Sequence, residues 1–143
     1  MAADRTANVT WSGSLTEGSG RIESVGSGSF GPLDVTWASR TEEPGGRTSP
    51  EELIAAAHAA CFSMALSGGL AKAGSPPERL ETSATVTFVP GTGITKSALT
   101  VRGTVPGMDE AAFREAAEAA KENCPVSQAL AAVPEITLDA SLA

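Results

Sequence analysis

The stretch Ser49–Ser67, SPEELIAAAHAACFSMALS, contains the strongest helix signal in the chain. Ser49 can cap the helix, Pro50 suits the first helical position, and Glu52 completes a reciprocal capping box with the serine. We expect the helix to end at about Lys72, because a glycine and two prolines follow shortly afterwards. This long helix decides how the rest of the chain is arranged.

Apolar or small residues occupy almost every face of the helix between Leu53 and Leu66. A helix that lies on a sheet normally has one polar face, so this pattern indicates a helix that is enclosed on several sides. The chain has 143 residues with four Phe, two Trp and no Tyr, so its interior must be built from small side chains. We therefore expect a partner subunit to help cover the helix.

Short β-type runs separated by turn residues flank the helix on both sides and predict an α+β fold in a single domain of residues 1–143. A second helix is expected over 110–123, with Asp109 as its cap, and Cys124–Pro125 should end it and start a short helix, VSQALAA (126–132). The expected strands are TANVTW (6–11), GRIES (20–24), LDVTWAS (33–39), the antiparallel hairpin ETSATVTFV (81–89) and ITKSALTVRGTV (94–105), and EITLDASL (135–142).

The charge and the apolar pattern restrict the partners and the location. A net charge of -7 argues against binding to nucleic acid or to an anionic membrane surface, because both need clustered Lys and Arg. The first residues, MAADRTANVTW, lack the basic start and apolar stretch of a secretory signal. Because His58 and Ser63 interrupt the longest apolar run, we expect no membrane span. We predict a cytoplasmic protein.

The two cysteines are the candidate reactive groups. Cys61 lies inside the apolar helix, where a thiol is usually inert packing. Cys124 precedes a helix that starts with Pro125, so unpaired amide N–H groups at that helix start favour its thiolate. In a cytoplasmic chain, a bond between the two cysteines is expected to be transient. A structural domain with two inert thiols remains the alternative.

His58, Glu51 and two nearby arginines are further candidates for the site. A zinc site from His58 and the two cysteines is disfavoured, because zinc ligands usually come in closely spaced pairs, and we expect His58 to be a hydrogen-bonded core residue. No metal is predicted. Glu51 shares the first helical turn with the capping glutamate, and Arg40 and Arg47 in the preceding loop are its possible partners.

Two motifs together resemble the OsmC/Ohr family, which comprises osmotically inducible protein C and the organic hydroperoxide resistance proteins. They are Ser49–Ser67 itself and NCPVSQAL at 123–130. The similarity extends to TWASR (36–40), GITKSAL (93–99) and EITLD (135–139), and thus over nearly the whole chain. The version HAACFSMAL of the central motif is more similar to the OsmC branch than to the Ohr branch.

The resemblance implies a peroxidase that reduces organic hydroperoxides with two cysteines and no metal, flavin or haem. It implies that Cys61 is the peroxidatic cysteine, that Cys124 is the resolving cysteine, and that Glu51 is the acidic residue of the PEEL motif. Arg40 is the best match to the arginine of the family, and Arg47 and Arg21 are the alternatives. A dithiol, either a lipoyl protein or a thioredoxin-like donor, would restore the two thiols.

The family also implies an intertwined homodimer, with antiparallel sheets wrapped around two long central helices. Glu51 and Cys61 are ten residues apart, which places them ~15 Å apart along the helix axis, so Glu51 cannot reach its own Cys61. We therefore expect Glu51 of one subunit to serve Cys61 of the other. The competing function from another class is a redox sensor or binding protein that uses the same cysteine pair without turnover.

Overall fold

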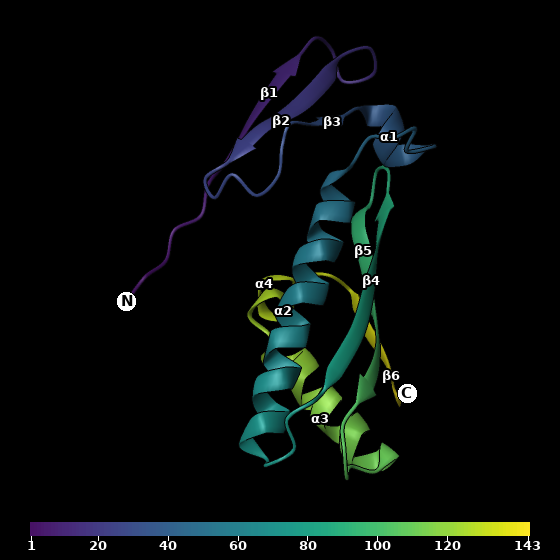
Figure 1. Ribbon diagram of the computed structural model, residues 1–143. Helices are drawn as coiled ribbons and strands as arrows, with labels where there is room; N and C mark the ends of the chain where they lie inside the picture. Colours follow the sequence, from purple (N-terminus) through teal and green to yellow (C-terminus); the bar gives the residue numbers. More distant parts are fainter. The chain divides into compact units, whose positions relative to one another are not determined.

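The computed structural model describes all 143 residues, and the chain divides into two compact units, Met1–Leu53 and Ile54–Ala143. The prediction of a single domain stays a prediction. The elements in chain order are β1 (Ala7–Ser12), β2 (Ser19–Val25), β3 (Leu33–Val35), α1 (Trp37–Thr41), α2 (Pro50–Lys72), β4 (Arg79–Val89), β5 (Gly93–Thr104), α3 (Glu110–Asn123), α4 (Pro125–Ala129) and β6 (Glu135–Leu142) (Figure 1).

The first unit contains an antiparallel sheet in the order β1-β2-β3, followed by α1. The first two strands agree with the prediction, but the third ends at Val35, and the predicted continuation to Ser39 is wrong. Thr36 and Ser39 explain the difference, because each side chain accepts a hydrogen bond from the backbone N–H of the other, at 3.0 and 2.9 Å. This capping box starts a helix where the sequence pattern suggested a strand.

Helix α2 runs from Pro50 to Lys72, as the sequence predicts. The hydroxyl of Ser49 accepts the N–H of Glu52 at 3.1 Å, which is the expected cap. The carboxylate of Glu52, however, accepts the hydroxyl of Thr48 at 2.8 Å, so the predicted return bond of Glu52 is replaced by a side-chain contact. The helix start is therefore stabilised by one half of the capping box and one additional threonine.

The second unit is built on a sheet in the order β4-β5-β6. Strands β4 and β5 form the predicted antiparallel hairpin, whereas β6 pairs in parallel with β5, so this sheet is mixed. Helices α2 and α3 lie beside this sheet (Figure 1). Both contribute buried side chains to the core. That core contains Phe62, Leu66 and Leu70 from α2, Leu99 and Val101 from β5, and Phe113, Ala117 and Ala120 from α3.

Buried and more exposed residues alternate along β5, so that one face of the sheet points into the core. Ser97, Leu99, Val101 and Gly103 are buried, and exposed or half-buried residues lie between them. A Cβ on Gly103 would lie 2.6 Å from two ring atoms of Phe113 on α3, so only glycine allows the helix this close to the strand. The sequence places Ser97 on the same inward face as the apolar residues, which matters for the site.

The open face of α2 agrees with the expectation that this chain alone does not enclose the helix. Met64 is 75% exposed, while Phe62, two residues earlier, is fully buried. By length and composition α2 is able to cross a membrane, with a mean hydropathy of 1.6 over a window of which 22% is buried. Core helices of soluble proteins pass the same test, so one such helix is weak evidence for a membrane span.

Candidate functional site

The second unit brings the two cysteines together, and neither is in a disulfide. Cys61 lies in the middle of α2 and is half-buried, whereas Cys124, the residue before α4, is fully buried. The two thiols lie close enough for each to shift the pKa of the other. Two neighbouring thiols, one reached by solvent and one not, are able to form a disulfide after a small movement.

The surroundings shift the pKa values of the two thiols in opposite directions. Burial raises the pKa of Cys61, the N–H of Val126 opposes that shift, and donation to Cys124 raises the pKa further. Burial also acts to raise the pKa of Cys124, but the Ser127 N–H, the Cys61 thiol and the Ser127 hydroxyl together lower it. The expectation that the start of α4 favours thiolate at Cys124 is confirmed, although its sulfur forms no regular capping hydrogen bond.

His58 lies one helical turn before Cys61 and is completely buried. Its Nδ1 lies 2.7 Å from the hydroxyl of Ser97 on β5, and its Nε2 lies 2.8 Å from the hydroxyl of Ser127 on α4. Burial lowers the pKa of His58, which keeps the imidazole neutral. The prediction of a hydrogen-bonded core histidine is confirmed.

The first unit holds a second feature, a buried carboxylate paired with an arginine. Nε of Arg40 donates to both oxygens of Glu51 at 3.0 and 3.1 Å, and Nη2 donates to Oε1 at 2.7 Å. Glu51 is 7% exposed, and the guanidinium carbon of Arg40 lies 5.9 Å from the ring centre of Trp37. The fork of bonds and the aromatic ring together fix the orientation of the guanidinium.

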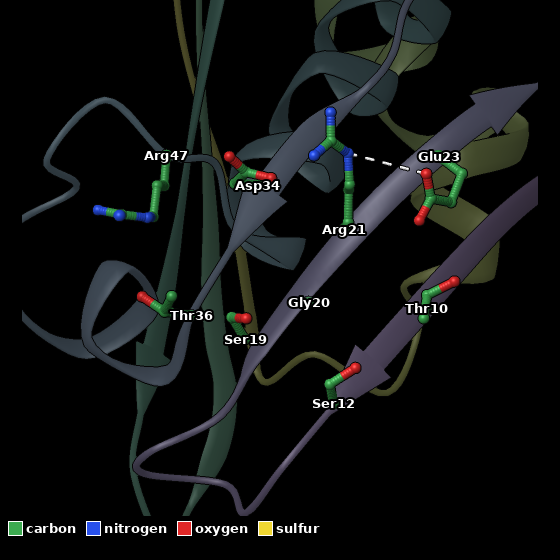
Figure 2. Close-up of a pocket in the computed structure, with 9 residues that line it drawn as sticks. All are labelled: Thr10, Ser12, Ser19, Gly20, Arg21, Glu23, Asp34, Thr36 and Arg47. Carbon is green, nitrogen blue, oxygen red and sulfur yellow. Dashed lines mark ion pairs between the residues drawn. The ribbon is translucent and has the colours of Figure 1, made fainter.

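The two alternative arginines lie elsewhere in the first unit. Arg21 and Arg47 both line a polar pocket of about 340 Å³ on the β1-β2-β3 sheet, and Arg21 pairs there with Glu23 at 3.7 Å (Figure 2). Of the three candidates, Arg40 is therefore the one that the structure shows paired with Glu51. This contact agrees with the preference for Arg40, but the role of the pair in chemistry stays a prediction.

An apolar groove of about 440 Å³ lies between α2 and α3 in the second unit. Its lining includes Ala65, one turn beyond Cys61, and Asn123, which precedes Cys124. Small side chains and Gly69 make up most of the remaining wall. Neither Phe62 nor Met64 lines this groove, since the first is buried in the core and the second is exposed.

Sequence reasoning missed Ser97, Ser127 and Trp37 as parts of these arrangements. Ser127 stood inside the CPVSQAL motif, three residues after a cysteine, and this spacing at a helix start was an available signal. The alternation along β5 places Ser97 on the inward face of the sheet, but only the packing of α2 against β5 brings it to His58. The structure shows no group of three His, Cys, Asp or Glu residues suited to a metal ion.

Comparison with known proteins identifies the family of this chain. A family model described as OsmC-like protein matches residues 43–139. The chain is 43% identical to the peroxiredoxin OsmC of Escherichia coli over 99% of both chains. This chain belongs to the OsmC family. The sequence-based recognition, including the OsmC branch, is thereby confirmed.

Solved structures of this fold confirm the α+β architecture of the OsmC protein described here. An organic hydroperoxide resistance protein from Elizabethkingia anophelis superposes with a TM-score of 0.71 at 23% identity, covering 100% of both chains. OhrB of Bacillus subtilis superposes with a TM-score of 0.66 at 25% identity, covering 96% of this chain and 98% of that chain. The shared fold places the cysteine pair of this OsmC chain on an established scaffold.

Proposed function

We propose that this protein reduces organic hydroperoxides to alcohols through a sulfenic acid on Cys61 and a Cys61–Cys124 disulfide. The observation that carries the proposal is the pair of neighbouring thiols, in which one sulfur is accessible and the other is buried. The enzyme class, a peroxidase, is confirmed by a relative named peroxiredoxin at 43% identity over 99% of the chain. The order of the steps and the role of each residue are the proposal.

The accessibility of Cys61 supports its role as the first nucleophile. Loss of the Cys61 proton leaves a thiolate on the sulfur that solvent reaches, and the N–H of Val126 stabilises this thiolate. This thiolate attacks the terminal oxygen of the hydroperoxide, an S–O bond forms, and the O–O bond breaks. The released alkoxide takes a proton from solvent, and Cys61 is left as a sulfenic acid.

Cys124 completes the cycle from the interior. Its sulfur attacks the sulfur of the Cys61 sulfenic acid, an S–S bond forms, and the oxygen leaves as water. A dithiol reductant then opens the disulfide by exchange, as a lipoyl protein or a thioredoxin-like donor is able to do. The buried position of Cys124 suits this role, because a thiol that peroxide cannot reach stays reduced until its partner is oxidised.

The groove between α2 and α3 supports an organic substrate. Its lining includes Ala65, one helical turn after Cys61, and Asn123, the residue before Cys124, and its walls are mainly apolar. Burying an alkyl group there contributes about 0.8 kcal/mol per methylene, an advantage that hydrogen peroxide lacks. Arg40 and Glu51 are proposed to bind the peroxide oxygen, because a fixed guanidinium stabilises developing negative charge.

We propose a homodimer in the cytoplasm as the working form. The exposed apolar face of α2, with Met64 at 75% exposure, needs a cover that one chain does not supply. The sharing of Glu51 and Cys61 between subunits rests on their ten-residue spacing and on the family resemblance. The cytoplasmic location rests on the sequence alone.

Turnover separates a peroxidase from a redox sensor that uses the same cysteine pair. The protein is supplied with dithiothreitol and a large excess of cumene hydroperoxide, and peroxide consumption is followed. We expect many equivalents to be consumed, with loss of activity in Cys61→Ser. Consumption that stops at one equivalent per chain would favour the sensor.

A further inference from the structure

We propose that His58 is a positioning residue for the second half of the reaction, in which Cys124 attacks oxidised Cys61, and that it acts through the hydroxyl of Ser127. The inference rests on the proposed function, because it concerns the conversion of the Cys61 sulfenic acid into the disulfide. Neither His58 nor Ser127 belongs to the residues assigned above to the attack on peroxide.

The contacts form one continuous chain from the imidazole to the resolving sulfur. Nε2 of His58 lies 2.8 Å from Oγ of Ser127, and the Ser127 side chain is close enough to Cys124 to lower the pKa of that thiol. On the other side of the ring, Nδ1 lies 2.7 Å from Oγ of Ser97 and is held there by β5. His58 and Cys124 are fully buried and Ser127 is 7% exposed, so water does not compete for these bonds.

The position of His58 is costly for a purely structural residue. Its neighbours on α2 are almost all alanine or larger apolar side chains, and His58 is the only histidine in the sequence. A buried ring with two polar nitrogens needs two partners, which a leucine or methionine would not need. Both partners are hydroxyls, and a hydroxyl is able both to accept and to donate a proton.

The groups that face the imidazole leave it free to act as a base. Ser97 meets it from β5 and Ser127 meets it from α4, and the titratable groups of the cluster are the thiols of Cys61 on α2 and Cys124 at the start of α4. Burial lowers the pKa of His58, so the ring is neutral at neutral pH. In the tautomer that the relay uses, Nδ1–H donates to Ser97 and the lone pair of Nε2 accepts the hydroxyl of Ser127, whose oxygen then accepts the proton of the Cys124 thiol.

The contacts from Cys124 through Ser127 to His58 form a proton relay, and the relay removes the thiol proton of Cys124 in the second step. After Cys61 is oxidised, the Cys124 thiol gives its proton to the oxygen of Ser127 while the Ser127 hydroxyl proton moves to Nε2 of His58. The Cys124 thiolate then forms the S–S bond as the S–O bond of the sulfenic acid breaks and hydroxide leaves. The proton held on His58 returns through Ser127 and neutralises the hydroxide to water, so the step needs no other reactant.

The test follows the two half-reactions separately after one equivalent of cumene hydroperoxide. Dimedone trapping reports the sulfenic acid on Cys61, and the rate of disulfide formation is read from intact mass across a pH series. In Ser127→Ala the sulfenic acid should form at the wild-type rate. Its conversion to the disulfide should be slower by about tenfold near neutral pH, since one pKa unit changes the thiolate population tenfold.

The pH profile distinguishes a relay from a structural role. The delay should shrink as the pH rises to 9.0, the ordinary pKa of a thiol, because Cys124 then ionises without help. His58→Gln keeps partners for both serines but takes up no proton, so it should show the same delay. Ser127→Thr retains the hydroxyl and should restore the wild-type rate.

Ser63→Ala is the matched control. It removes a partly buried hydroxyl from the same helix, one that bonds Ala59 and Thr82 rather than the histidine, and should leave both steps unchanged. Wild-type disulfide formation in Ser127→Ala and His58→Gln, or equal slowing at every pH, would overturn the relay alone. Wild-type protein that forms no sulfenic acid would overturn the proposed function and the relay together.

Discussion

His58 makes the stability of the fold depend on pH at the scale of a single side chain. Its folded pKa is below the ordinary 6.5 because the buried ring resists charging. Below pH 6.5 the unfolded chain therefore binds a proton that the folded chain does not, and folding stability is lost as the pH falls. The contribution of His58 is fully present above 6.5.

We predict that the stability advantage of the wild-type protein over His58→Gln shrinks as the pH is lowered below 6.5. Urea unfolding at a series of pH values measures this difference. Ser63→Ala, which keeps the histidine, should lose stability with pH as the wild type does. A constant gap between wild type and His58→Gln at all pH values would show that the ring does not titrate on unfolding.

The ion pair of Arg40 and Glu51 also contributes to the stability of the fold. Glu51 is 7% exposed, so Arg40→Met leaves a buried carboxylate without its partner and should cost about 1–3 kcal/mol of stability. The double variant Arg40→Met with Glu51→Leu removes both charges and should recover most of that loss. Thermal or urea unfolding measures both effects.

Peroxide reduction should respond differently from stability in the same variants. If Arg40 binds the peroxide oxygen, the double variant stays slow in forming the sulfenic acid although it is stable. Recovery of the wild-type oxidation rate along with stability would show that the pair only supports the fold. The comparison therefore separates a structural ion pair from a substrate-binding one.

At the scale of helices and strands, most of the fold follows from local signals. The bounds of α2, α3 and β6 agree with the cap and breaker residues in the sequence, such as Asp109, whose carboxylate accepts the N–H of Ala112 at 2.8 Å. Helix α1 was missed, because β-branched and aromatic residues outweighed the Thr36 and Ser39 cap in the pattern. The parallel pairing of β6 was not predictable locally, since register depends on distant residues.

Substitutions at two neighbouring glycines test whether the groove between α2 and α3 binds the alkyl group of the peroxide. Gly68 and Gly69 both lie on α2, and a Cβ on either would meet nothing within 4 Å, but only Gly69 lines the groove. Gly69→Leu should reduce kcat/KM for cumene hydroperoxide by about tenfold or more, because it occupies space for the alkyl group. The rate with hydrogen peroxide should change little.

Gly68→Leu serves as the control for this change, because it adds the same side chain next to the groove but outside its lining. It should leave the preference for the organic peroxide as it is in the wild type. An equal loss with both peroxides in Gly69→Leu would mean that the groove does not hold the substrate.

At the scale of the whole molecule, the sequence predicted the family and the cysteine pair but not the surroundings of that pair. The contact between Cys61 and Cys124 was implied by two motifs, whereas Ser97 becomes a partner of His58 only through the packing of α2 on β5. Partners that meet only through tertiary packing leave no local pattern.

Subunit mixing tests the proposal that Glu51 and Cys61 of different chains share a site. Glu51→Gln and Cys61→Ser proteins are each expected to be poorly active, and the two are unfolded together and refolded. In a mixed dimer with shared sites, one site regains both an intact Glu51 and an intact Cys61. We therefore expect activity to reappear in the mixture, whereas continued inactivity would place both residues in one chain.

The measurement that tests the central claim most directly is the intact mass and free-thiol count of the reduced protein after one equivalent of cumene hydroperoxide. We predict that the free thiols of Cys61 and Cys124 disappear together and that the mass of the protein changes by that of one disulfide. This oxidation should be faster than with hydrogen peroxide, and Cys61→Ser should form no such bond. Persistence of both thiols, or oxidation that does not join them, would contradict the proposed two-cysteine chemistry.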